Sequence, residues 1–309
     1  MDKFVMPRKL TQVIFSIVVI LACSDSHADD VLSVLYPEVP SPYDQIFSEI
    51  IAGIESEYAG DVSSLSLEKS DSVSESVSWV QQQNTKMLIA LGGRGYKVAK
   101  QISVDTPTVI GALPIRPNGL SGVSLLADPE VLFTTLKQLA PKIKRVHVVY
   151  SPENRWLIEL ATVQAGLLGL ELNNIEVKSI KNAAVSYESL LNDINPATDA
   201  VWLPLDRYTA HEQAILPNLL EKSWEQNLVL FSSKPEHAKR GALFSLFPDH
   251  YALGKQLVKM VTAMHADRRV KGVIPLKEMK LAVNLRTAAH LGLDYESQKK
   301  ETFHLTFPQ

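Results

Sequence analysis

The sequence predicts an α/β protein with parallel sheets. From Asp29 onward, short apolar runs rich in β-branched residues alternate with amphipathic helical patterns. Continuous apolar strands that are each followed by a helix are typical of parallel sheets covered by helices on both faces. At 309 residues the chain exceeds the usual size of a single core, which favours two domains of ordinary size.

In the first half of the chain, apolar runs predict strands that lead into helices or a loop. These are VLSVLYP (31–37) before the helix 43–58, KMLIALGG (86–93) before the helix 95–102, TPTVIGALP (106–114) before a loop, and then the helix 128–141. The serine-rich residues 63–79 contain spaced apolar positions, so we interpret them as strand, loop and helix cap. This half therefore predicts one βα series.

A second βα series follows. It consists of RVHVVYS (145–151) before the helix 154–170, DAVWLPLD (199–206) before the helix 210–226, and LVLFSS (228–233) before residues 234–241. The polar, basic residues 141–146 separate the two series and are the expected first crossing between domains. The predicted domains are residues 29–143 plus about 249–272, and residues 144–248 plus about 273–309.

Three helix starts carry capping chemistry. Residues 41–44 offer a serine N-cap, a proline at the first helical position and a carboxylate at the third. Residues 151–153 repeat this pattern, and residues 209–212 fit a capping box. Ligands of open parallel sheets collect at such strand-to-helix junctions, where the expected residues are Tyr43, Asn154, Arg155, Arg207 and Tyr208.

The N-terminus predicts an export signal, residues 1–28. Basic residues precede the apolar run VIFSIVVILA, which is too short to span a bilayer as a mature helix. Cleavage after Ala28 competes with a lipoprotein box that would place a lipid on Cys23. Because Cys23 is the only cysteine, the folded body has no disulfide, thiolate zinc site or cysteine nucleophile.

Sequence motifs do not favour catalysis. GGRGYK (92–97) lacks the ending of a P-loop, and its preferred reading is a ligand-facing turn that carries Gly93 and Arg94. Asp206 and His211 have no accompanying nucleophile elbow. The eight histidines form no metal-binding pair. We therefore expect a protein that is not an enzyme and has no metal and no cofactor.

Four arginines each follow an apolar run: Arg94, Arg116, Arg155 and Arg207. Guanidinium groups bind carboxylate or phosphate through paired, charge-assisted hydrogen bonds. Their convergence would make a cationic cleft, and the alternative is that some point into solvent or pair with nearby carboxylates. A formal net charge of -3, with no basic stripe, argues against nucleic-acid binding.

The segments KRGALFSLFPDHYALGKQLVKMV and IPLKEMKLAVNLRTAAHLGLDY resemble the closing part of ABC-transporter substrate-binding proteins of the tryptophan- and tyrosine-binding lipoprotein type. KMLIALGGRGYKVAK, NGLSGVSLLADPE, KRVHVVYSPEN and AVWLPLDRYT resemble earlier segments of that family in the same order. The resemblance covers roughly residues 30–294.

This resemblance implies a periplasmic binding protein of type I, in which two Rossmann-like lobes joined by several crossovers close on a small molecule. Carried over by position, the expected ligand-binding residues are Tyr43, Asp44, Gly93, Arg94, Arg116, Asn154, Arg155, Asp206, Arg207, Ser232, Asp249 and Tyr251. Arginines stand where the family usually has small polar residues, which points to a more acidic ligand such as a dicarboxylate or a phosphorylated metabolite.

The sequence thus favours an exported, periplasmic solute-binding protein that acts as a monomer. It would capture an amino acid-like or anionic metabolite between its lobes and deliver it to an ABC permease. The alternative is a periplasmic sensory module that reports ligand binding to a membrane receptor or sensor kinase.

Overall fold

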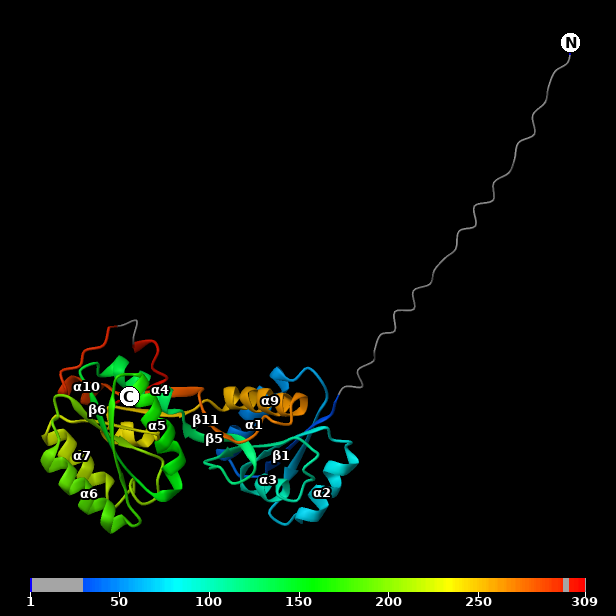
Figure 1. The fold of residues 1–309 in the computed structure, drawn as a ribbon, viewed down its shortest axis with the longest axis horizontal. Coiled ribbons are helices and arrows are strands. Elements are labelled where there is room, and N and C mark those ends of the chain that lie inside the picture. Colours follow the sequence, from blue (N-terminus) through cyan, green and yellow to red (C-terminus); the bar gives the residue numbers. More distant parts are fainter. Residues whose placement is uncertain (2–29, 297–299, 309) are drawn as a thin grey trace.

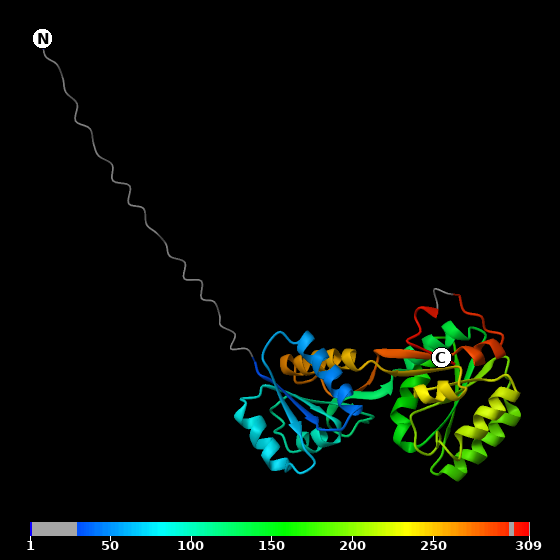
Figure 2. The same ribbon diagram turned by 180° about the vertical axis from the view of Figure 1, so that it is seen from behind.

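The computed structural model describes residues 1, 30–296 and 300–308, which form two α/β lobes that lie side by side (Figure 1). The expected signal segment, with Cys23 and Ala28, falls outside these residues. Each lobe has its own sheet with helices on both faces, as Figure 2 shows from behind. The predicted α/β class is confirmed.

The first lobe contains the sheet that begins the chain. Its strands are β1 (Leu32–Pro37), β2 (Val62–Leu67), β3 (Met87–Leu91), β4 (Thr108–Leu113), β5 (Ser121–Ala127) and β11 (Val273–Leu276). Its helices are α1 (Tyr43–Glu57), α2 (Val73–Gln82), α3 (Gly92–Ala99) and α9 (His250–Ala266).

The second lobe is built in the same way. Its strands are β6 (Arg145–Tyr150), β7 (Glu171–Glu176), β8 (Asp199–Leu203), β9 (Val229–Ser232), β10 (Phe244–Pro248), β12 (Met279–Asn284) and β13 (Leu305–Phe307). Its helices are α4 (Pro129–Leu139), the 3₁₀ turn η1 (Pro152–Asn154), α5 (Arg155–Leu167), α6 (Ile180–Asp193), α7 (Leu216–Glu225), α8 (Pro235–Arg240) and α10 (Leu285–His290).

Both sheets have the same central strand order. The first is β11-β5-β4-β3-β1-β2 and entirely parallel, and the second is β13-β12-β10-β9-β8-β6-β7. The second sheet departs from the parallel prediction at one place, where β12 pairs antiparallel with β10. In each sheet the strand order reverses at its first strand, β1 or β6, which has a later strand on either side. Ligands of such sheets bind at the carboxyl ends of the strands at this point.

The described chain passes between the lobes three times. It leaves the first lobe after β5, returns after β10 and leaves again between β11 and β12. Two crossings end in an aspartate that caps the next helix: Asp128 accepts from the Glu130 amide at 2.8 Å, and Asp249 accepts from the Ala252 amide at 3.1 Å. Crossings of this kind allow two lobes to move as rigid bodies about a hinge.

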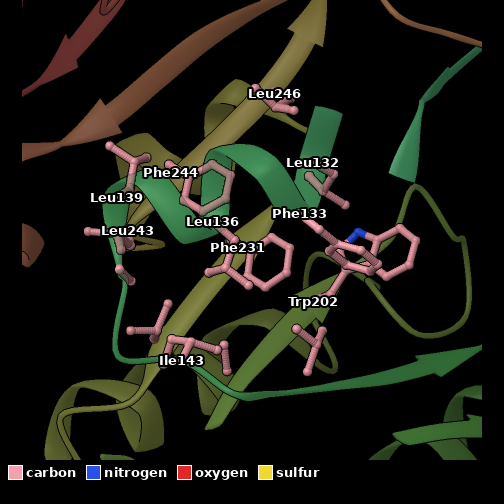
Figure 3. Close-up of a cluster of buried hydrophobic side chains, with 14 of the residues drawn as sticks. Leu132, Phe133, Leu136, Leu139, Ile143, Trp202, Phe231, Leu243, Phe244 and Leu246 are labelled. Atoms are coloured by element: carbon pink, nitrogen blue, oxygen red, sulfur yellow. The ribbon is translucent and has the colours of Figure 1, made fainter. Parts of the chain in front are cut away.

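Helix α4 packs against the second sheet, so the first crossing lies at Asp128 and not at the expected residues 141–146. Its Phe133 is fully buried and contacts Trp202 of β8 edge to face, with 5.8 Å between the ring centroids. Figure 3 shows the leucines of α4 against Phe231 and Phe244 of the same sheet. The basic character of residues 141–146 suggested a linker, but the apolar face of α4 decides which lobe the helix joins.

Helices α1 and α9, far apart in the sequence, lie side by side on the first sheet (Figures 1 and 2). Glycines allow their close approach. A Cβ added at Gly53 would lie 2.0 Å from the backbone oxygen of Tyr251, and one added at Gly254 would lie 2.1 Å from that of Ile50. Helix α9, which follows the second crossing, therefore packs closely against α1 and belongs to the first lobe.

We expect Gly53→Ala to lower the free energy of unfolding by about 2 kcal/mol, because backbone atoms of the neighbouring helix must move to admit the methyl group. Urea denaturation followed by circular dichroism measures this. Gly166→Ala is the control, since nothing lies within 4 Å of the added Cβ in α5, and it should be neutral or stabilising. Equal stability of Gly53→Ala and the wild type would contradict the close approach.

Helix α7 begins later than expected. Residues 209–212 do not cap it, because the helix starts at Leu216 with Pro217 in its first turn. A proline further inside a helix would lose a backbone hydrogen bond and clash with the preceding turn. Residues 207–214 therefore form turns beside the carboxyl end of β8.

Candidate functional site

A cavity of about 910 Å³ lies between the two lobes. This is within the usual size range for sites that bind small organic molecules. The first-lobe wall comes from α3, β5 and the end of β4, and the second-lobe wall comes from segments that follow β6, β8 and β9. The lining residues are Tyr96, Leu113, Pro114, Ile115, Arg116, Asn118, Leu126, Ser151, Glu153, Asn154, Trp156, Leu205, Asp206, Arg207, Ala210, His211, Glu212, Gln213 and Lys234.

An irregular end of β4 forms much of the first-lobe wall. Its register against β5 shifts between Ile110 and Leu113. Within this shift Ala112 has a φ of 57°, a left-handed conformation that costs a residue with a Cβ roughly 1 kcal/mol. The chain then carries the apolar Ile115 and the exposed Arg116 to the cavity. Among the described residues, Arg116 has no hydrogen-bond or ion-pair partner.

Asp206 holds two loops of the second-lobe wall together. One carboxylate oxygen accepts from the Ser151 amide at 2.8 Å and from the Asn154 side chain at 2.9 Å. The other accepts from the amides of Tyr208 and Thr209 at 2.8 and 3.1 Å. Burial opposes ionisation, but these donors outweigh it and hold the pKa of Asp206 below its ordinary value.

Arg207, Glu153 and Tyr208 form a cluster of contacts at the rim of the cavity. The Arg207 guanidinium donates to the Glu153 carboxylate at 3.1 Å and to the Tyr208 hydroxyl at 2.8 Å. It also lies over the Tyr208 ring, 4.6 Å from the centroid. Arg207 and Glu153 therefore neutralise each other at this rim.

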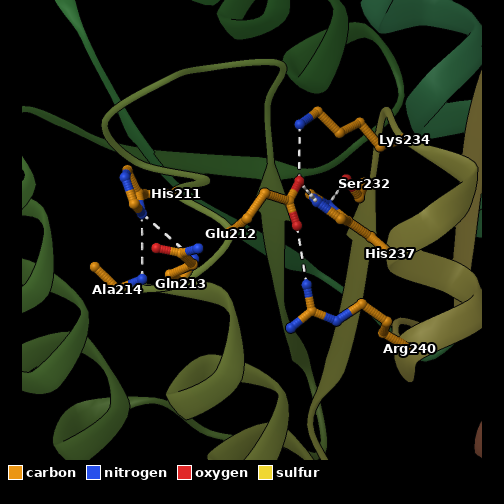
Figure 4. Close-up of polar contacts among 8 residues, drawn as sticks. All are labelled: His211, Glu212, Gln213, Ala214, Ser232, Lys234, His237 and Arg240. Atoms are coloured by element: carbon orange, nitrogen blue, oxygen red, sulfur yellow. Dashed lines mark hydrogen bonds and ion pairs between the residues drawn. The ribbon is translucent and has the colours of Figure 1, made fainter.

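Glu212 is the centre of a charged cluster on the second-lobe wall (Figure 4). Its carboxylate contacts Lys234 at 2.9 Å, His237 at 3.0 Å and Arg240 at 2.9 Å. Burial raises its pKa, but the bonds from Lys234 and His237 outweigh that effect and lower the pKa of Glu212 to about 2. Glu212 is therefore charged at every physiological pH, and the two cations that contact it, Lys234 and Arg240, exceed its single negative charge.

Ser232, His237 and Glu212 form a hydrogen-bonded series in which Ser232 and His237 are buried and Glu212 is exposed. A carboxylate can only accept, so Nε2 of His237 carries the proton toward Glu212 and Nδ1 accepts from the Ser232 hydroxyl at 2.6 Å. Burial, opposed by Glu212, lowers the pKa of His237 and favours the neutral ring. Because Ser232 and His237 have no exposed surface, the series stiffens the wall and offers no nucleophile to the cavity.

Four of the twelve residues expected to bind ligand line the cavity: Arg116, Asn154, Asp206 and Arg207. Asn154 is buried and donates to both Asp206 and the Leu205 carbonyl. Asn154 and Asp206 thus shape the wall, Arg207 is paired with Glu153 at the rim, and Arg116 is unpaired among the described residues.

The expected residues at the ends of β1 and β3 do not line the cavity. Tyr43 and Asp44 are exposed in the first turn of α1, and Gly93 faces open space. Arg94 donates to the backbone carbonyls of Glu38 and Leu67 within its own lobe. Its guanidinium joins the end of β2 to the segment after β1, within the first lobe.

Arg155, Ser232, Asp249 and Tyr251 also lie outside the lining. Arg155 makes a two-pronged ion pair with Glu176, with both hydrogen bonds at 2.8 Å. Ser232 is buried against His237, and Asp249 caps α9 at a lobe crossing. Tyr251 is exposed on α9. Local partners that the sequence does not reveal hold these side chains away from the cavity.

Sequence reasoning missed several lining residues. Tyr96 and Asn118 form a hydrogen bond of 3.2 Å on the first-lobe wall. Trp156, Glu212 and Lys234 line the second-lobe wall. Lys234 directly follows the expected strand 228–233, and Trp156 comes a few residues after the expected strand 145–151, so strand-end position could have found both.

Two wider features of residues 30–296 and 300–308 bear on function. No group of three or more histidine, aspartate, glutamate or cysteine side chains in these ranges could hold a metal ion. No helix there has the length and apolar character needed to span a membrane.

Comparison with known proteins identifies one family. The family described as ABC transporter substrate binding protein matches residues 116–301 of this chain. No curated protein matches the sequence.

Three solved structures share the fold, which is that of type I periplasmic binding proteins. A ligand-free, open structure of CD0873, a substrate-binding protein of Clostridium difficile, is 16% identical with a TM-score of 0.59, and covers 90% of this chain and 99% of its own. An ABC domain of Streptococcus pneumoniae in complex with L-Trp is 18% identical with a TM-score of 0.52, covering 91% and 100%. A conserved domain protein of Vibrio cholerae is 18% identical with a TM-score of 0.51, covering 90% and 99%.

Proposed function

The chain belongs to the ABC transporter substrate binding protein family, and on this premise we propose that it captures one small molecule in the cavity between its lobes for delivery to an ABC permease. The cavity carries this proposal, because both lobes contribute to its walls. A ligand that contacts both walls stabilises an arrangement in which the lobes close about the three chain crossings. The permease could then recognise the closed form.

We propose that the protein works outside the cytoplasm as a monomer, either free in the periplasm or held by a lipid on Cys23. The basic and apolar N-terminal segment supports export. Binding without catalysis is supported by the burial of Ser232, which keeps its hydroxyl away from a ligand in the cavity.

Native mass spectrometry of the protein purified from its host tests the proposal. We expect a complex with one chemically unchanged small molecule per chain. Gln213→Trp places an indole in the cavity lining and should abolish the complex, whereas Gln82→Trp, on the exposed end of α2, should retain it. Equal occupancy of both variants, or recovery of a reaction product, would contradict the proposal.

A further inference from the structure

The described carboxylates that line the cavity are already committed to other groups. Glu153 pairs with Arg207, and Glu212 contacts three cationic or imidazole side chains. Asp206 accepts four hydrogen bonds, two on each oxygen. A carboxylate offers about four lone-pair positions, so Asp206 has none left for a ligand.

Every described carboxylate of the lining therefore already has a cationic partner or a full set of hydrogen-bond donors, and none has an unmatched charge for a ligand ammonium group. A buried ammonium without a carboxylate or a full set of acceptors is strongly destabilised. An α-amino acid would therefore bring into this cavity a charge that its described lining does not match.

One cationic side chain of the described lining remains available for an anionic group of the ligand. Lys234 is engaged by Glu212 and Arg207 by Glu153. Arg116 alone among the described lining cations has no partner, and it is exposed on the first-lobe wall. A guanidinium in this state fits one carboxylate through a paired hydrogen bond.

Apolar side chains from both lobes form another part of the lining and suit an apolar body. Leu113, Ile115 and Leu126 approach from the first lobe, and Trp156, Leu205 and Ala210 approach from the second. Apolar and aromatic walls with few directed polar groups are typical of sites for small organic molecules.

We propose that the solute is an organic acid with a single carboxylate, an apolar body and no ammonium group, and that Arg116 binds the carboxylate. This inference rests on solute capture in the cavity, as proposed above. It replaces the dicarboxylate suggested by the four arginines, because Arg94 and Arg155 bind groups within their own lobes and Arg207 is paired with Glu153, which leaves one unpartnered arginine in the described lining.

A matched series of compounds tests the class. Isothermal titration of the protein, freed of bound solute, compares 3-phenylpropanoate, L-phenylalanine and 2-phenylethylamine, which share a phenyl group and a two-carbon chain. The series is repeated with 4-methylpentanoate, L-leucine and 3-methylbutylamine. We expect at least one acid to bind about 10-fold or more tightly than its amino acid, and neither amine to bind measurably.

Arg116→Gln should weaken binding of the acid about 10-fold or more. Arg155→Gln removes the same charge from a residue that lies next to the lining residue Asn154 but is paired with Glu176 outside the lining. The affinity of this variant for the acid should stay within about 3-fold of that of the wild type. Tighter binding of either amino acid, equal affinities of the two variants, or no binding of either acid would overturn the proposed class. A neutral or cationic solute found by native mass spectrometry would overturn the class alone, whereas absence of any solute from the cavity would overturn solute capture itself.

Discussion

Asp206→Ala is expected to lower the free energy of unfolding by about 3–5 kcal/mol and to weaken solute binding at least 10-fold. Four donors lose a charged acceptor, and each such bond contributes about 1.5–3 kcal/mol. Water from the adjacent cavity can hydrate some of the four freed donors, so the loss of stability is smaller than the sum of the four hydrogen-bond contributions. The loops that carry Leu205 and Arg207 then lose their fixed positions. Chemical denaturation and titration calorimetry measure the two effects.

Two variants show whether Asp206 acts through the loops. Asp206→Asn keeps one oxygen for the Tyr208 and Thr209 amides and places an amide group near two donors, so an intermediate loss of stability is expected. Glu153→Gln removes an exposed carboxylate from the same cavity, and its effect on stability should be within about 1 kcal/mol. If Asp206→Asn abolished binding at unchanged stability, Asp206 would be a direct ligand contact instead.

Phe133→Ala is expected to destabilise the second lobe by about 3–5 kcal/mol, the usual cost of deleting a buried aromatic ring. The ring lies against Trp202 in the core shown in Figure 3, so its removal would leave a new, empty space between α4 and the second sheet. Hydrogen exchange should show that the substitution accelerates amide exchange more in β6, β8 and β9 of the second lobe than in β1 and β3 of the first.

Phe133→Leu keeps most of the apolar volume and should cost about half as much or less. Equal loss of protection in the first-lobe strands would contradict the assignment of α4 to the second lobe. This pair of variants therefore tests where the chain first crosses between lobes.

The apolar runs were sufficient to predict the fold class, because strands such as Met87–Leu91 and Asp199–Leu203 are buried along their whole length. The lobe that α4 joins depends on where its apolar face finds a partner, and sequence order does not give that. The delayed start of α7 was foreseeable in principle, since Pro217 cannot lie deep in a helix.

The candidate site was predictable to the level of loops and less so to that of side chains. The strand ends predicted Asn154, Asp206 and Arg207 as ligand-binding residues, and the structure places all three in the cavity lining. Arg155 is adjacent to Asn154 in sequence, yet it pairs with Glu176 at the end of strand β7, outside the cavity lining. Such pairing between residues far apart in the chain decides where a side chain points, and a single sequence does not reveal it.

A crystal structure of the protein with the solute that co-purifies from its host tests solute capture most directly. We expect electron density for one small molecule that contacts residues of both lobes, with a carboxylate within hydrogen-bond distance of Arg116. Density for the solute elsewhere on the surface, or contact with one lobe alone, would contradict solute capture.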